Sequence, residues 1–174
     1  MKKIFLMAII LPLVFSCGKE EKSETNTDII EYNDPSTESD VNSAPTAKTT
    51  NHIVIKANDD MTFDQTSFTV KVGDEITLLL MNNGTMSKEA MGHNLVILNQ
   101  GVDLGEFAFA ASSEKDADYI PKDKQTDILA HTKLLGGKEN DQIKFKIEKA
   151  GEYQFLCSFP GHAATMQGKI IAIN

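Results

Sequence analysis

The stretch Cys157-Ser-Phe-Pro-Gly-His162-Ala-Ala-Thr-Met166 places a cysteine, a histidine and a methionine within ten residues near the C-terminus. A thiolate, an imidazole and a thioether on one short loop suit a soft, redox-active metal, and a trigonal Cys/His/His set with a long axial Met is an arrangement that binds copper. Such a set needs a second histidine. His93 follows Gly92 in the stretch Met91-Gly-His-Asn-Leu-Val96 and opens an apolar run. Together the two stretches predict one copper site.

Each of these residues, taken alone, has a simpler interpretation. An inward-facing cysteine on a strand is usually a small core hydrophobe, and a single methionine usually fills space in a core. A histidine after a glycine often belongs to a turn. The combination and its spacing favour the metal site over these separate roles. His52 and His131 are expected to have structural or surface roles.

The residues before the loop alternate as a β-strand requires. In the stretch 151–157, Tyr153, Phe155 and Cys157 share one face because the side-chain period of a strand is two, so the sulfur is expected on the core face. Residues 99–124 are expected to form a flap with one short helix at 106–111. Further strands are expected at 52–57, 68–72, 76–81, 93–98, 126–131, 142–148 and 168–173. About eight strands with one short helical flap predict an all-β fold, a Greek-key β-sandwich.

Charge and cysteine content exclude two classes of protein. The net charge is −8, and the basic residues form no cluster of the kind that a nucleic-acid surface needs. The only cysteines are Cys17 and Cys157. One lies at a predicted processing site and the other in the metal-binding loop, so a disulfide framework is not expected.

The N-terminal third is expected to lie outside the folded domain. Residues 1–16 have a basic start and an apolar stretch too short to span a bilayer, as in a secretory signal peptide. The ending Leu13-Val-Phe-Ser-Cys17 resembles a bacterial lipobox, which predicts that Cys17 is lipidated; the alternative is an ordinary cleaved signal that ends near a cysteine. Residues 17–50 are polar and acidic, which predicts a disordered, lipid-anchored tether. The folded domain is expected at 51–174.

Three motifs resemble those of the azurins, bacterial blue copper proteins with the cupredoxin fold. They are Met91-Gly-His-Asn94, Ala130-His-Thr-Lys-Leu134 and the loop 157–166, in which four residues separate Cys from His and three separate His from Met. The resemblance covers roughly residues 53–173. The chain therefore resembles an azurin in a predicted lipoprotein form.

The resemblance implies a role for each residue of the site. His93, Cys157 and His162 would form a trigonal plane around copper, with Met166 and the carbonyl oxygen of Gly92 as distant axial contacts. Asn94 would tie the two ligand-bearing segments together, and the backbone N–H of Phe159 would donate to the Cys157 sulfur. An apolar patch around His162 would receive redox partners; its candidates are Met61, Met91, Phe159, Pro160, Ala163 and Ala164.

The implied function is single-electron transfer, in which no substrate is transformed and no small molecule is bound. The partners would be respiratory: a c-type cytochrome or another redox protein of the cell envelope, met transiently. Lipidated Cys17 would hold the protein on the periplasmic face or the outer surface of a bacterial membrane. The alternative is a copper carrier, storage or copper-resistance protein, which would favour an exposed site. A copper enzyme would need a second copper site, for which four histidines are too few, and zinc is a weaker choice because methionine is a poor zinc ligand.

Overall fold

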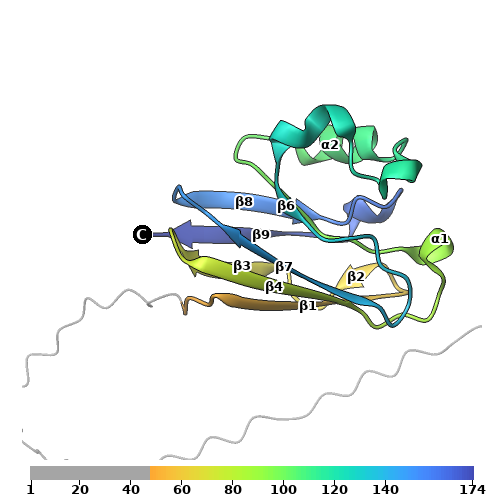
Figure 1. Ribbon diagram of the computed structural model, residues 1–174, viewed down its shortest axis with the longest axis horizontal. Coiled ribbons are helices and arrows are strands. Elements are labelled where there is room, and N and C mark those ends of the chain that lie inside the picture. Colours follow the sequence, from red (N-terminus) through yellow and green to blue (C-terminus); the bar gives the residue numbers. More distant parts are fainter. Residues whose placement is uncertain (1–47) are drawn as a thin grey trace, which may run out of the picture. The chain divides into compact units, whose positions relative to one another are not determined.

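Two β-sheets face each other in the part of the chain that the computed structural model describes, residues 48–174 (Figure 1). The first sheet has the strand order β2-β1-β4-β7 and consists of β1 (His52–Asn58), β2 (Thr62–Phe63), β4 (Glu75–Asn82) and β7 (Asn140–Lys146). The second has the order β3-β9-β8-β5-β6 and consists of β3 (Ser67–Lys71), β9 (Gln167–Ile173), β8 (Gly151–Leu156), β5 (Val96–Leu98) and β6 (Ile128–His131). Both sheets are mixed, because β1 pairs with β4 and β3 with β9 in parallel. The predicted signal peptide, Cys17 and residues 17–47 of the predicted tether lie outside the described residues.

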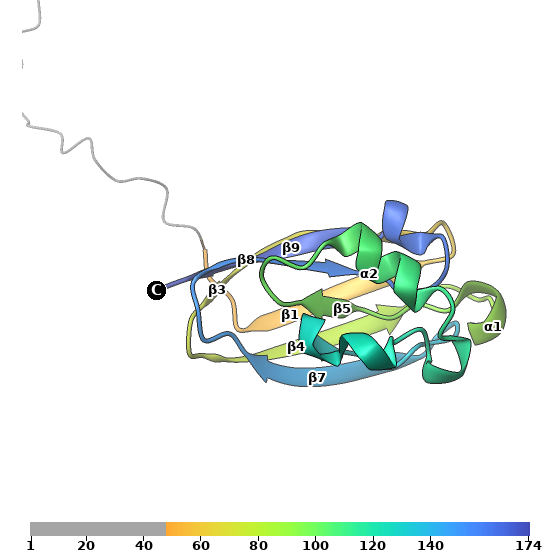
Figure 2. The same cartoon turned by 90° about the horizontal axis from the view of Figure 1, so that it is seen from above.

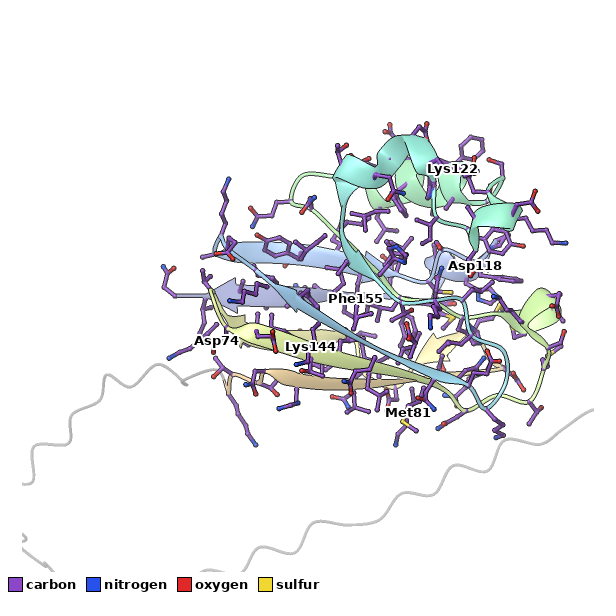
Figure 3. All side chains as sticks on the ribbon, in the orientation of Figure 1. Asp74, Met81, Asp118, Lys122, Lys144 and Phe155 are labelled. Carbon is purple, nitrogen blue, oxygen red and sulfur yellow. The ribbon has the colours of Figure 1, made fainter. Side chains whose placement is uncertain are left out.

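Alternating side chains build the core between the sheets. In β1, Ile53, Ile55 and Ala57 are buried while their neighbours face solvent, as expected for a strand with one wet face. Phe155 of β8 lies between the two sheets (Figure 3), with its ring centroid 5.9 Å from that of Phe63 and 6.3 Å from that of Phe68. The sandwich is thus held by contacts between strands far apart in the sequence.

A helical flap covers the outer face of the second sheet. Helix α2 (Leu104–Ala111) begins after Asp103, whose side chain accepts a hydrogen bond from the backbone N–H of Glu106 at 2.8 Å, a helix cap. Figure 2 shows α2 lying over β5 and β8. Its buried Phe107 and Ala111 pack in a second apolar cluster with Val96, Leu98 and Leu156. Because of this cover, β5 is buried on both faces.

Four short helices lie in the connections between the strands. They are α1 (Lys88–Met91) and the 3-10 helices η1 (Lys115–Ala117), η2 (Lys122–Asp127) and η3 (His162–Ala164). Within residues 48–174, none of the helices has the length and apolar character needed to cross a membrane.

The prediction of a β-sandwich with a short helical flap is confirmed, and the differences are local. The strand expected at 93–98 is only β5, because residues 93–95 turn inward at the end of the sandwich and His93 makes an isolated bridge to Leu135. The first two residues of the strand expected at 126–131 belong to η2 instead. Five short elements were not expected, because each is too short to show a clear period: β2, α1 and the 3-10 helices η1, η2 and η3. β2 and α1 lie at the same end of the sandwich (Figure 1), and His93 follows α1 after Gly92.

Candidate metal centre

Three buried side chains converge at this end of the sandwich. His93, Cys157 and His162 each offer one ligand atom, and these atoms all lie within 4.8 Å of one another. The Cys157 sulfur is 3.6 Å from Nδ1 of His162, and the two imidazole rings lie 5.0 Å apart between centroids. The three residues come from two chain segments that are distant in sequence, one after α1 and one after β8. The fold therefore assembles the set that the sequence predicts.

The two histidines are held in the neutral form that binds metals. Burial lowers the pKa of His162 to about 4, with repulsion from His93 adding to the effect. Burial also lowers the pKa of His93, although the Asn58 carbonyl and two nearby carboxylates oppose it. Despite the nearness of that carbonyl, neither ring nitrogen of His93 makes a hydrogen bond of acceptable geometry to any residue in the range 48–174. A buried imidazole without a hydrogen bond is costly, and a metal ion would satisfy it.

Cys157 has the inward orientation that the strand period predicts. Tyr153, Phe155 and Cys157 all belong to the core between the sheets, and Cys157 is completely buried. Burial raises the pKa of its thiol to about 11, while the backbone N–H groups of Asn94 and Phe159 partly offset this by favouring the thiolate. The N–H of Phe159 is the donor expected from the sequence, and that of Asn94 is an addition. Metal binding would displace the thiol proton, since metals bind the thiolate.

The next residue on each segment joins the two segments together. The backbone N–H of Ser158 donates to Oδ1 of Asn94 at 2.8 Å, and Nδ2 of Asn94 donates to the Ser158 hydroxyl at 2.8 Å. Both side chains are buried. Because Asn94 follows His93 and Ser158 follows Cys157, this pair links the neighbours of two ligand candidates, as Asn94 was expected to do.

Backbone hydrogen bonds close the loop that carries Met166. The N–H of Cys157 donates to the Met166 carbonyl at 2.9 Å, and the N–H of Met166 donates to the His162 carbonyl at 2.8 Å. Met166 is fully buried in the same core as Cys157. The loop turns at Gly161, whose φ is 83°, a value that residues with a side chain rarely adopt.

Close packing also explains the glycine before His93. A Cβ at Gly92 would lie 2.5 Å from the carbonyl oxygen of Lys88 and 3.0 Å from the Leu134 side chain. Only glycine therefore lets the chain leave α1 and enter the site at this point. Gly92 itself is buried.

The six candidates for the docking patch differ in exposure. Met61, Pro160 and Ala164 are exposed, whereas Met91, Phe159 and Ala163 are half-buried. Phe159 lies against His162, with 4.6 Å between ring centroids. His162 is only 3% exposed, and the ring of His93 lies near its ring as well, with 5.0 Å between centroids. His52 and His131, expected to be non-ligands, are exposed and belong to no cluster of metal-ligating side chains among the described residues.

Sequence reasoning missed two residues of the flap and one of the loop. The Ser158 hydroxyl donates to the carbonyl of Tyr119 at 2.8 Å, and Asn94 Nδ2 lies 3.2 Å from the carbonyl of Asp118. A polar residue directly after the inward-facing Cys157 is a signal that could have identified Ser158. The contacts of Asp118 and Tyr119 run through backbone oxygens and leave no sequence signal.

The donor set fits a soft metal. One thiolate, two neutral imidazoles and a thioether side chain in the adjoining core are the ligand types that copper sites of this geometry use. The buried, unpartnered nitrogens of His93 give the fit a structural basis.

Comparisons with known proteins point to the same metal. Residues 49–172 match the family described as copper binding proteins, plastocyanin/azurin family. Azurin-1 of Alcaligenes xylosoxydans xylosoxydans is 40% identical over 124 residues, which cover 69% of this chain and 95% of the relative. Outer membrane protein H.8 of Neisseria meningitidis serogroup B is 38% identical over 123 residues, which cover 69% of this chain and 66% of the relative.

The fold is shared as well. The structure of dithionite-reduced auracyanin from Roseiflexus castenholzii superposes with a TM-score of 0.62 at 30% identity, covering 73% of this chain and 100% of that one. The sequence match, the shared fold and the His-Cys-His cluster agree. The chain belongs to the plastocyanin/azurin family of copper-binding proteins, and it is a blue copper protein that carries one copper ion for electron transfer.

Proposed function

We propose that His93, Cys157 and His162 hold the copper ion in a trigonal plane, with Met166 and the carbonyl oxygen of Gly92 as weak axial contacts. The observation that carries this assignment is the convergence of His93, whose two ring nitrogens lack hydrogen-bond partners among residues 48–174, with the Cys157 sulfur and Nδ1 of His162. When bound, copper supplies a one-electron couple between Cu(II) and Cu(I).

The chain's own contribution is to keep the ligands still. Cys157 leaves a strand of the core, and the backbone hydrogen bonds of the loop fix Met166 relative to Cys157 and His162. Two backbone N–H groups face the sulfur. Donors of this kind orient a metal ligand and tune the metal's potential. A site that is rigid before the electron arrives needs little rearrangement when the oxidation state changes.

The electron would leave through the surface next to His162. Phe159 lies against the His162 ring, and Pro160 and Ala164 of the same loop are exposed. A small, mostly apolar surface suits a brief encounter, because a redox partner must leave after the electron has moved. The partner we propose is a c-type cytochrome or another redox protein of the cell envelope. No small-molecule substrate is transformed, so the protein is not an enzyme in this proposal.

We place the protein on a membrane of the cell envelope, attached through lipidated Cys17. The support is the lipobox-like sequence Leu13–Cys17 and a relative named as an outer membrane protein. A tether formed by residues 17–50 would keep the copper domain near membrane-bound partners and raise its effective concentration there.

A spectrum of the copper-loaded protein tests the ligand assignment. Wild type should show an intense visible band from charge transfer between the Cys157 thiolate and Cu(II). Cys157→Ser should lose the band, and so should His93→Ala. His131→Ala is the matched control, because His131 is exposed; this variant should keep the band. A wild type that binds copper stoichiometrically but stays colourless would contradict the assignment.

Burial of the site also separates electron transfer from copper carriage. A carrier must hand over its metal, which favours exposed ligands, whereas all three ligand candidates are buried. In stopped-flow experiments with a c-type cytochrome, electron exchange should be fast while transfer of copper to a chelator is slow. The opposite ranking of the two rates would favour a carrier.

A further inference from the structure

Two consecutive residues of the flap have an unusual backbone conformation. Asp118 has φ 54° and Tyr119 has φ 62°, both in the left-handed region that residues with a Cβ seldom adopt. Only four non-glycine residues in the range 48–174 have positive φ, and these two are adjacent. Such strain persists only where the surroundings impose it, and it gathers at functional sites.

The left-handed conformation directs two carbonyl groups toward the copper site. The carbonyl of Asp118 lies 3.2 Å from Asn94 Nδ2. The carbonyl of Tyr119 lies 2.8 Å from the Ser158 hydroxyl, whereas the alternative acceptor, Asn94 Oδ1, lies 3.2 Å from it. The single hydroxyl hydrogen of Ser158 therefore goes to Tyr119. Asn94 then donates both its amide hydrogens, one to the Asp118 carbonyl and one to the Ser158 hydroxyl oxygen.

The side chains of the same two residues reach other parts of the site. Asp118 makes an ion pair of 3.0 Å with Lys88 in α1, the helix that leads to His93. The buried ring of Tyr119 meets Phe159 edge-on, with 5.1 Å between centroids, and Phe159 in turn lies against His162. Figure 3 shows Asp118 at the end of the sandwich where Figure 1 labels α1.

We propose that Asp118 and Tyr119 form a positioning element for the copper ligands. Their left-handed turn holds Asn94 and Ser158 in register and so sets the placement of His93 relative to Cys157. This inference rests on the proposed ligand set. It assigns the flap a role in the site, beyond covering the sheet.

Substitutions of Asp118 can test the backbone conformation separately from the side chain. The Asp118 side chain is 45% exposed, so its replacement does not disturb the core. Asp118→Gly and Asp118→Val both remove the ion pair with Lys88. Glycine accepts the left-handed conformation freely, whereas valine, with its branched Cβ, opposes it. A difference between the two variants therefore reports on the turn.

Lys138 provides the matched control. It also has a positive φ, 68°, and is exposed, but it lies in the turn before β7. Its hydrogen bonds go to the carbonyl groups of Asn82 and Asn83, and not to Asn94 or Ser158. Lys138→Val should strain the backbone without touching the proposed element. Its copper site should match that of Lys138→Gly.

Copper retention and a copper-free measurement give two readouts. We expect Asp118→Gly to lose copper to a chelator within about twofold of the wild-type rate, and Asp118→Val to lose it at least about fivefold faster with a shifted visible band. In the copper-free protein, the side-chain amide protons of Asn94 should exchange slowly with water in wild type and Asp118→Gly, and fast in Asp118→Val. If Asp118→Val does not fold, Asp118→Ala supplies a milder strain and should show the same changes to a smaller extent.

The outcomes separate this inference from the ligand assignment. Equal copper retention and equal Asn94 exchange in the glycine and valine variants would overturn the positioning role. The positioning role would also be overturned if Lys138→Val, relative to Lys138→Gly, changed copper retention as much as Asp118→Val does relative to Asp118→Gly. A wild type without the visible band would overturn the ligand assignment instead, while the copper-free exchange of Asn94 would still decide whether the turn holds this side chain.

Discussion

At the residue scale, backbone hydrogen bonds hold the loop at Met166. Its N–H donates to His162 and its carbonyl accepts from Cys157, so these bonds do not involve the sulfur, and a leucine of similar volume can fill the same buried space. Met166→Leu should therefore still bind one copper ion, at a cost in stability below about 1.5 kcal/mol. Because a weak axial donor helps to stabilise Cu(II), its removal should raise the reduction potential measured by voltammetry.

Met81 supplies the control for that substitution. Figure 3 shows Met81 on the outer side of the first sheet, away from the core. Met81→Leu should leave the potential unchanged. If Met166→Leu loses copper completely, Met166 is an essential ligand and the ranking of axial and trigonal contacts proposed above is wrong.

The residues of the site differ in how far the sequence reveals them. Cysteine, histidine and methionine at fixed spacing carry their chemistry in the side chain, so the sequence indicates them directly. Tyr119 is 39 positions from Ser158 and contacts it through a carbonyl group, which every residue has. The identity of that partner depends on how the flap folds back, and this is a property of the whole chain.

At the scale of elements, helix α2 packs on the second sheet through one of its faces. Phe107 is fully buried against β5 and β8, whereas Phe109, two positions later, is 81% exposed. Phe107→Ala should lower the free energy of unfolding by about 3–5 kcal/mol, as for other large buried aromatics. Phe109→Ala should change it by less than about 0.5 kcal/mol. Denaturant titrations of the copper-free protein would measure both, and similar values for the two variants would contradict the packing of α2.

The sequence predicts the boundaries of a strand well where one of its faces meets solvent, and poorly where both faces are buried. The alternation in β1 and β4 is visible in the sequence because one face of the first sheet meets solvent. β5 is buried on both sides, so its apolar run gives no sign of where the strand begins. The capping pair Asp103 and Glu106 marks the start of α2 two residues earlier than composition alone suggests.

At the scale of the whole molecule, the ligand candidates gather at one end of a rigid sandwich. The long strands of both sheets supply the core, and the connections at one end carry His93, Cys157, His162 and Met166. The flap, attached to the outer face of one sheet, reaches the same end through Asp118 and Tyr119. Cys157 and Met166 belong to the core between the sheets, so the strained turn of the flap is joined through Asn94 and Ser158 to the packing of the sandwich itself.

The predicted membrane anchor also concerns the whole molecule. Substituting each of the two cysteines in turn tests it. Cys17 is expected to carry lipid, whereas Cys157 is buried in the core. In cells labelled with a fatty acid, the full-length wild type and Cys157→Ala should both incorporate label and sediment with membranes, although the latter loses its copper. Cys17→Ala should incorporate none, because acyl chains are attached to the cysteine that follows the signal peptide. Label on Cys17→Ala would show that lipid is attached to a residue other than Cys17. An unlabelled wild type released in soluble form would show that residues 1–16 are an ordinary cleaved signal and that the copper domain diffuses freely to its partners.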